Sequence, residues 1–242
     1  MLDISLPQSI RFERQSDMEA TVTIEPCFPG YGLTLGNAMR RILLSSLPGA
    51  AVTELKIRGV QHEFSTAAHV KEDVVEILTN IKQLRPKLLD TEKTTLKLSL
   101  KGKHTVKASD FQINSQVEIM NPDLVIATMT DEAASLNLDL TIEAGLGYLP
   151  VETREKREKE IGRIQVDAVF SPVRNVSFKT EHVRVGGVTN YDKIVLGITT
   201  DGSISPEDAF RKSAQILVDQ FQRLTQSSDD AETEKSQLSV AS

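Results

Sequence analysis

The chain has 242 residues, of which 39% are hydrophobic and 26% are charged. These proportions are ordinary for a folded protein, and a chain of this length forms one large domain or two small ones. Its 34 acidic and 28 basic residues give a net charge of -6. This excess of acid argues against sequence-independent binding to nucleic acid, which uses clustered Lys and Arg, so we expect any role at DNA to be indirect.

The start of the chain and its single cysteine bear on the compartment. Cys27 has no second cysteine with which to form an internal disulfide. Residues 1–10 lack the basic and apolar regions of a secretory signal, and no run approaches the roughly 18 apolar residues that cross a bilayer. We expect a cytoplasmic protein with no membrane role.

The first part of the chain predicts a strand followed by a helix. Residues 19–25 alternate between apolar and polar side chains, which is typical of a half-buried strand. A turn rich in Pro and Gly follows, and Thr34 is placed to cap a helix that ends before Pro48 and Gly49. The apolar positions of this helix recur at helical spacing: Leu35, Ala38, Met39, Ile42 and Leu43.

The middle of the chain predicts a mostly antiparallel β module with one helix. Strand-like alternation occurs at residues 52–57, 94–100, 124–129 and 135–142. A helical pattern interrupts it and is closed by Pro86. That pattern consists of Val70, Val74, Ile77, Leu78 and Ile81.

The last part predicts three strands, at residues 164–170, 176–185 and 193–199, and then a helix that Ser205 caps with Pro206 at its first position. Its apolar positions form a heptad-like seam made of Phe210, Ala214, Leu217, Phe221 and Leu224. The seam packs either on the chain's own sheet or against a helix of another subunit, and its spacing does not decide between them. The polar composition of residues 227–242 predicts a disordered tail.

The sequence shows few signs of a catalytic or metal-binding site. The four histidines are scattered away from Cys27, and no common hydrolase, kinase, Walker or zinc-protease motif is present. Residues 30–36 are rich in glycine between a strand and a helix, so they form either a nucleotide-binding turn or only a tight connection. The third glycine is one place late for the nucleotide fingerprint, which favours the connection.

Two adjacent arginines, Arg40 and Arg41, follow that turn on an otherwise apolar helix. Neighbouring residues on a helix point about 100° apart, so both cannot avoid the covered faces. At least one either meets an oxygen partner at the edge of a packed surface or extends along that surface to solvent.

The run from residue 33 to residue 53, which includes Leu-Gly-Asn-Ala-Met-Arg-Arg-Ile-Leu-Leu-Ser-Ser, closely resembles a signature of the bacterial and plastid RNA polymerase alpha subunits. Segments similar to the same family follow in the same order, and the resemblance extends from about Glu19 to Leu224. These segments are residues 62–66, 71–78, 147–150, 161–164 and 166–173. A protein of this kind is a non-catalytic subunit of DNA-directed RNA polymerase, a nucleotidyltransferase, and needs no cofactor of its own.

The resemblance implies an α+β fold with two subdomains. An α/β dimerisation subdomain comes from both chain ends, residues 1–48 and 172–228, and a mostly antiparallel β insert occupies residues 49–171. Residues 229–242 remain as a disordered polar tail. Alpha subunits usually continue into a small domain that binds promoter DNA, whereas this sequence stops in the polar tail. We therefore expect this chain to meet DNA only through the assembled complex.

The resemblance also implies the partners and the residues that contact them. The chain is expected to form a homodimer and to hold the beta and beta-prime subunits together. The implied dimer interface consists of Leu35, Met39, Ile42, Leu43, Phe210, Leu217, Phe221 and Leu224. Arg41 and Leu44 are implied in contact with beta, whereas Lys82, Val166 and Asp167 are implied in contact with beta-prime.

Overall fold

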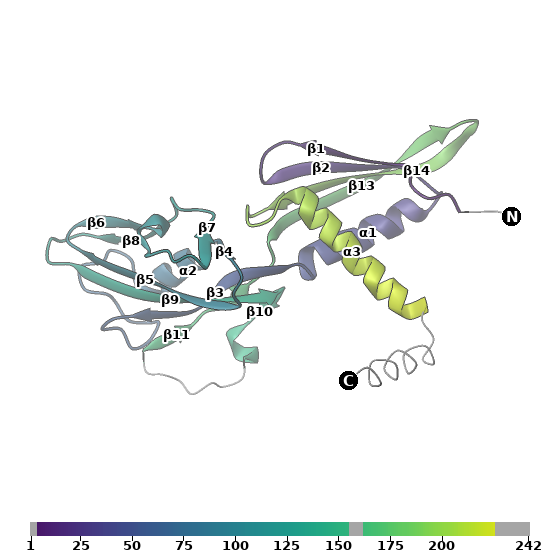
Figure 1. Cartoon of the computed structure of the whole chain (residues 1–242). Coiled ribbons are helices and arrows are strands. Elements are labelled where there is room, and N and C mark those ends of the chain that lie inside the picture. Colours follow the sequence, from purple (N-terminus) through teal and green to yellow (C-terminus); the bar gives the residue numbers. More distant parts are fainter. Residues whose placement is uncertain (1–3, 155–161, 226–242) are drawn as a thin grey trace, which may run out of the picture.

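The computed structural model describes residues 4–154 and 162–225. Within these residues, three α-helices accompany strands that all pair in antiparallel fashion. The α+β class predicted from the sequence is confirmed. The chain forms two lobes (Figure 1), and each lobe is built around its own cluster of buried apolar side chains.

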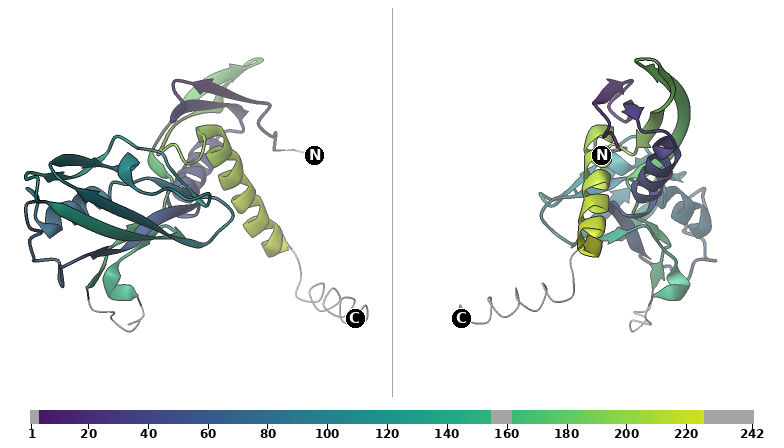
Figure 2. Two further views of the ribbon diagram at one scale, coloured as in Figure 1. Left: turned by 60° about the vertical axis from the view of Figure 1, so that its left-hand side comes forward. Right: turned by 90° about the vertical axis from the view of Figure 1, so that its right-hand side faces the viewer.

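The first lobe is built from both ends of the chain. Its four-stranded sheet has the order β1-β2-β14-β13. The strands are β1 (Ser9–Arg14), β2 (Glu19–Cys27), β13 (Val173–Val185) and β14 (Val188–Thr200). The helices α1 (Tyr31–Ser45) and α3 (Pro206–Thr225) lie on one face of this sheet (Figures 1 and 2). Alternate strand residues such as Val22 and Leu196 point to the helices and are fully buried, as strand periodicity requires.

The second lobe contains the residues between α1 and β13. Its main sheet has the order β11-β3-β9-β5, formed by β3 (Pro48–Ile57), β5 (Lys93–Lys101), β9 (Ser135–Leu146) and β11 (Arg163–Gln165). One face is covered by helix α2 (Val74–Ile81) and two ribbons. The ribbons pair β4 (Pro86–Leu88) with β7 (Val117–Ile119) and β6 (His104–Lys107) with β8 (Val125–Met129).

A small ribbon lies between the two large clusters. It pairs β10 (Tyr148–Leu149) with β12 (Ala168–Val169), next to a third apolar cluster that includes Ala51 and Phe170. The approach here is very close, because a Cβ added at Gly49 would lie 1.9 Å from the carbonyl oxygen of Phe170. Two short 3-10 turns, Ala108–Asp110 and Val151–Thr153, complete the described elements.

The predicted elements agree with the structure except at three places. Residues 164–170 form the two short strands β11 and β12, not one strand, because the chain leaves β3 after residue 165 and pairs next with β10. Helix α1 begins at Tyr31, before Thr34, because Gly30 caps it in a left-handed conformation with φ 85°. Helix α2 begins after Asp73, so Val70 lies outside it. The predicted tail, residues 229–242, lies outside the described residues.

Candidate subunit-interaction surfaces

Helix α3 begins at the cap that the sequence predicts. The Ser205 hydroxyl accepts a hydrogen bond from the Asp208 amide at 3.1 Å and donates one to the Asp208 carboxylate at 2.7 Å. Glu207 and Asp208 place negative charge in the first turn, where it interacts favourably with the helix dipole. The first turn of α3 is therefore well capped.

The seam of α3 is covered over only half its length. Phe210 is buried in the chain's own core, where its ring meets the ring of Phe12 edge-on at a centroid distance of 5.5 Å. Leu217 is half-buried, and farther along Phe221 and Leu224 are 61% and 79% exposed. The chain's own sheet thus covers the beginning of the seam, and the second half of α3 extends away from it (Figure 2).

Helix α1 packs tightly against the sheet through small residues. Gly36 faces the ring of Phe178, and an added Cβ would lie 2.6 Å from that ring. Met39 and Leu43 are buried in the core of the first lobe, whereas Leu35, Ile42 and Leu44 are half-buried. Met39, Leu43 and Phe210, which were expected at a dimer interface, make their contacts within the chain in this structure.

The two arginines of α1 have different surroundings. The Nε of Arg40 donates a hydrogen bond to the carbonyl oxygen of Val176 at 3.3 Å, which ties the helix to β13. Arg41 is exposed one position farther along. Among the described residues no hydrogen bond or ion pair of the Arg41 guanidinium is seen.

The glycine-rich turn before α1 already holds a carboxylate. The amides of Gly30 and Gly32 donate to one oxygen of Asp192 at 2.9 and 3.0 Å, and Asp192 is buried on β14. A phosphate at this turn would need the same donors at the positive end of the helix. The internal carboxylate already occupies these donors, so Gly30 and the first turns of α1 (residues 31–36) serve as a tight strand-to-helix connection.

The second lobe brings two of the predicted contact residues together. Lys82, just after α2, and Asp167, between β11 and β12, form an ion pair with 2.9 Å between Nζ and Oδ2. The other Asp167 oxygen accepts a hydrogen bond from the Val151 amide at 3.0 Å. The pKa of the Asp167 carboxyl is lowered, first by the hydrogen bond from the Val151 amide and second by Lys82. Both interactions favour the ionised carboxylate.

Val166, the third residue of that predicted contact, is buried in the core of the second lobe. Its carbonyl oxygen accepts a hydrogen bond from Arg154 at 3.0 Å, and the same guanidinium donates to the carbonyl of Thr53 at 2.9 Å. Arg154 thereby clamps the segment after β11 onto β3. We infer that Val166 supports the position of Asp167 and does not itself face a partner.

Some important residues were missed by sequence reasoning. Asp192 and Arg154 are ordinary charged residues in the sequence, and nothing in their neighbours shows that they bind the backbone of distant segments. The exposed apolar residues Leu146, Tyr148 and Val169, next to the small ribbon, were missed as well. Tyr148 and Val169 are direct cross-strand neighbours, which only the strand pairing shows.

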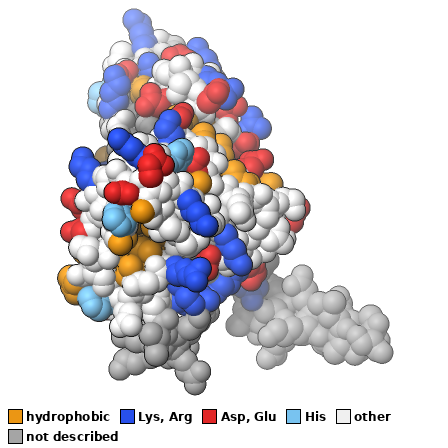
Figure 3. Space-filling view, turned by 90° about the vertical axis from the view of Figure 1, so that its left-hand side faces the viewer, with side chains coloured by type: hydrophobic (Ala, Val, Ile, Leu, Met, Phe, Trp, Pro, Cys, Tyr) orange, Lys and Arg blue, Asp and Glu red, His pale blue; other side chains and the backbone are white. Residues whose placement is uncertain are grey.

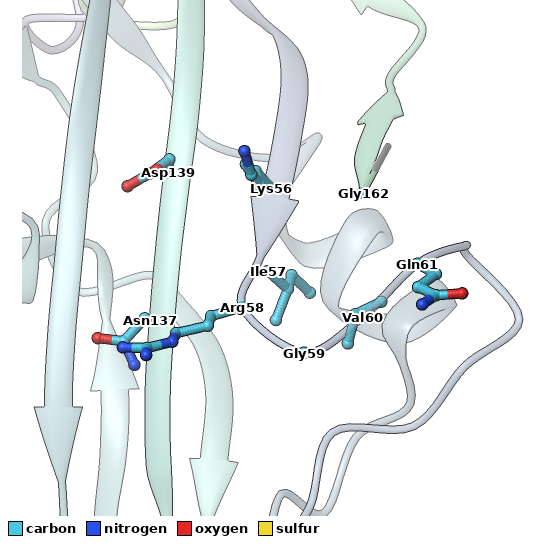
Figure 4. Close-up of a pocket in the computed structure, with 9 residues that line it drawn as sticks. All are labelled: Lys56, Ile57, Arg58, Gly59, Val60, Gln61, Asn137, Asp139 and Gly162. Carbon is cyan, nitrogen blue, oxygen red and sulfur yellow. The ribbon is translucent and has the colours of Figure 1, made fainter. Parts of the chain in front are cut away.

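The hollows on the second lobe are lined by a mixture of charged and apolar residues. A cavity of about 500 Å³ lies beyond the end of β3, where Lys56, Arg58 and Asp139 line it (Figure 4). Acidic and basic side chains are interspersed over the end of this lobe, as Figure 3 shows. Within the described ranges, no group of three or more His, Cys, Asp or Glu is placed to hold a metal ion, and no helix is long and apolar enough to span a membrane.

These features define the class of protein. It is an α+β chain that presents helix faces, an exposed arginine and a fixed ion pair on its surface, which are features suited to contact with other proteins.

Comparison with known proteins then gives the family. Residues 55–171 match the family described as the RNA polymerase Rpb3/RpoA insert domain. The DNA-directed RNA polymerase subunit alpha of Carboxydothermus hydrogenoformans is 49% identical over 222 residues, covering 92% of this chain and 70% of that protein. The corresponding subunit of a Roseiflexus species is 45% identical, covering 93% of this chain and 68% of that protein. That of Herpetosiphon aurantiacus is 46% identical, covering 90% and 65%. The chain belongs to the family of DNA-directed RNA polymerase alpha subunits, as its sequence predicted.

Proposed function

We propose that the chain acts by assembly: two copies dimerise through α1 and α3, and the dimer holds the beta and beta-prime subunits together for RNA synthesis. DNA is met only through the assembled complex. The cytoplasmic location expected from the sequence belongs to the same proposal.

The observation that carries the dimer is the exposed second half of α3. Phe221 and Leu224 continue the stripe that begins with buried Phe210, and no described part of the chain covers them. Fully burying one phenylalanine side chain stabilises a complex by about 1.5 to 3 kcal/mol, so burial of this stripe against another chain is favourable. Half-buried Leu35, Ile42 and Leu217 border the same helices and extend the interface.

The two large subunits are assigned to different surfaces. Arg41 and half-buried Leu44, both on α1, face beta in this proposal. The ion pair of Lys82 with Asp167 faces beta-prime, and buried Val166 supports it from behind. A charged group held at a fixed position suits a partner surface, because little side-chain freedom is lost on binding.

The dimer is tested with Phe221→Asp, which places a charge in the proposed seam. An aspartate buried there without a partner carries a desolvation cost in addition to the lost apolar contact. We expect the variant to sediment as a monomer where the unmodified chain sediments as a dimer.

The matched control is Phe64→Asp. Phe64 is also an exposed phenylalanine, at 81% against 61% for Phe221, but it lies on the second lobe before α2. This control should leave the dimer unchanged. A dimer that survives Phe221→Asp, or that Phe64→Asp disrupts to the same extent, would show that the second half of α3 is not the seam.

A further inference from the structure

The helix-bearing face of the first sheet extends beyond the helices of its own chain. Ile194 on β14, Ile24 on β2 and Ile10 on β1 are paired across the sheet and form one row on this face. Their side chains are 0%, 6% and 52% exposed in that order. The row is therefore covered at the centre of the sheet and open at its β1 edge.

The segment before β1 lengthens this open surface. We call residues 4–8, which precede β1, the N-terminal arm. Its apolar residues Ile4 and Leu6 are 52% and 80% exposed, and the exposed Ile10 follows at the start of β1. Two residues after Ile10, Phe12 already packs on Phe210 of α3. One apolar surface thus runs from the core of the first lobe along β1 to the arm.

The second half of α3 does not cover the arm of its own chain. Its exposed apolar residues Val218, Phe221 and Leu224 recur every three residues along one stripe. Figure 1 and the left view of Figure 2 place the arm and the second half of α3 on the side of the molecule away from the second lobe. Two apolar surfaces that no described residue covers therefore lie at the same end of the molecule.

We propose that in the dimer the N-terminal arm of one copy covers the second half of α3 of the other copy. The inference rests on the proposed dimer and names the surface that receives Phe221 and Leu224. A twofold axis makes any such contact occur twice, because the same patch of each copy is used. Each chain carries both an arm and an exposed α3 stripe. A second copy of the chain can therefore cover both surfaces at once.

The contact uses the face of β1 and not its free edge. Pro7 has no amide hydrogen to donate, and Arg11, Glu13 and Arg14 place charges along the edge strand. Proline and charged residues are the usual means by which an edge strand avoids pairing with another strand. The apolar arm residues remain available for a helix.

The first test is Leu6→Asp in the whole chain, with the dimer dissociation constant measured by sedimentation equilibrium. Leu6 is nearly fully exposed in the single chain, so the substitution should not affect folding. Because the lost contact occurs twice in the dimer, we expect the dissociation constant to rise by about 100-fold or more. Phe64→Asp, matched in exposure at 81%, should leave it unchanged.

The second test joins the two surfaces directly. A Leu6→Cys variant is mixed with a Leu224→Cys variant and treated with a short bis-maleimide. Buried Cys27 is the only native cysteine and should not react. We expect a covalent product of two chains in the mixture and little of it when either variant is treated alone.

The outcomes separate the inference from the proposed function. If Phe221→Asp dissociates the dimer but Leu6→Asp leaves it intact, or if the mixture gives no additional cross-linked product, the arm does not cover α3 and the inference is overturned. If Phe221→Asp also leaves the dimer intact, the proposed seam itself is wrong.

Discussion

At the scale of single residues, the Asp167 carboxylate links stability to pH. The Val151 amide and then Lys82 lower its pKa below the ordinary value. In the unfolded chain an aspartate has a pKa of about 3.9. The ionised group therefore stabilises the fold fully above about pH 3.9, and this contribution is lost as the pH falls through the lowered pKa of the folded chain.

Substituting Lys82→Met tests this account. The pKa of Asp167 should rise only part of the way toward its ordinary value, because the larger cause, the hydrogen bond from Val151, remains. A carboxyl-carbon NMR titration of both proteins measures this change. A pKa that stays the same would show that Lys82 does not act on Asp167 in solution, whereas a full return would show that the Val151 bond depends on Lys82.

Individual contacts between residues far apart in the sequence could not be predicted from the sequence. Asp192 lies 162 positions from Gly30, and Arg154 lies 101 positions from Thr53, so the contacts between them follow from the fold and from no local pattern. Arg40 shows the intermediate case. Its position beside Arg41 on an apolar helix predicted a contact for at least one of the two, but the Val176 carbonyl could not be named in advance.

At the scale of elements, Gly49 controls how β3 meets the segment before β13. A side chain at this position would collide with the backbone oxygen of Phe170, which cannot move away as a flexible side chain could. We expect Gly49→Ala to lower the free energy of unfolding by about 1 to 3 kcal/mol, as overpacking in a tight site does. Urea unfolding measures the change.

Gly187→Ala is the matched control for this substitution. No atom lies within 4 Å of the Cβ that it would add, and the residue has no positive φ. The change in the free energy of unfolding should stay within about 0.5 kcal/mol. If Gly49→Ala is as mild as Gly187→Ala, β3 and the Phe170 segment are not in the close contact described here.

Elements with a strong local signal were predictable from the sequence. Ser205 and Pro206 mark the start of α3, and strict alternation marks β9, because in both cases neighbouring residues carry the whole pattern. Residues 164–170 were predicted as one strand because their alternation continues without a break. The switch from β3 to β10 is a choice of pairing partner, and alternation within one segment carries no information about it.

At the scale of the whole molecule, the chain builds its first lobe from segments far apart in sequence. Strand β2 pairs with β14, which lies beyond the entire second lobe. Periodicity alone did not predict this arrangement, whereas the resemblance to the alpha subunits did. The same holds for the α3 seam, because its spacing did not decide between packing on the chain's own sheet and packing on a helix of another subunit. In the structure, the chain's own core covers the first half. We propose that the second copy of a dimer covers the second half.

The proposed contact with beta gives a prediction at this scale. Arg41→Ala should leave the dimer intact and weaken capture of beta by about tenfold or more, because a charge-assisted hydrogen bond is lost and its partner is stranded. Co-purification of beta with the variant dimer measures the effect. Arg184→Ala, an exposed arginine on β13, is the control and should capture beta normally. Normal capture by Arg41→Ala would remove Arg41 from the interface.

The most direct test of the account is the native mass of the complex that the unmodified chain forms with both large subunits. Assembly through α1, α3 and the second lobe predicts a single species that contains two copies of this chain with one beta and one beta-prime. A chain that stays a monomer and retains neither large subunit would contradict it.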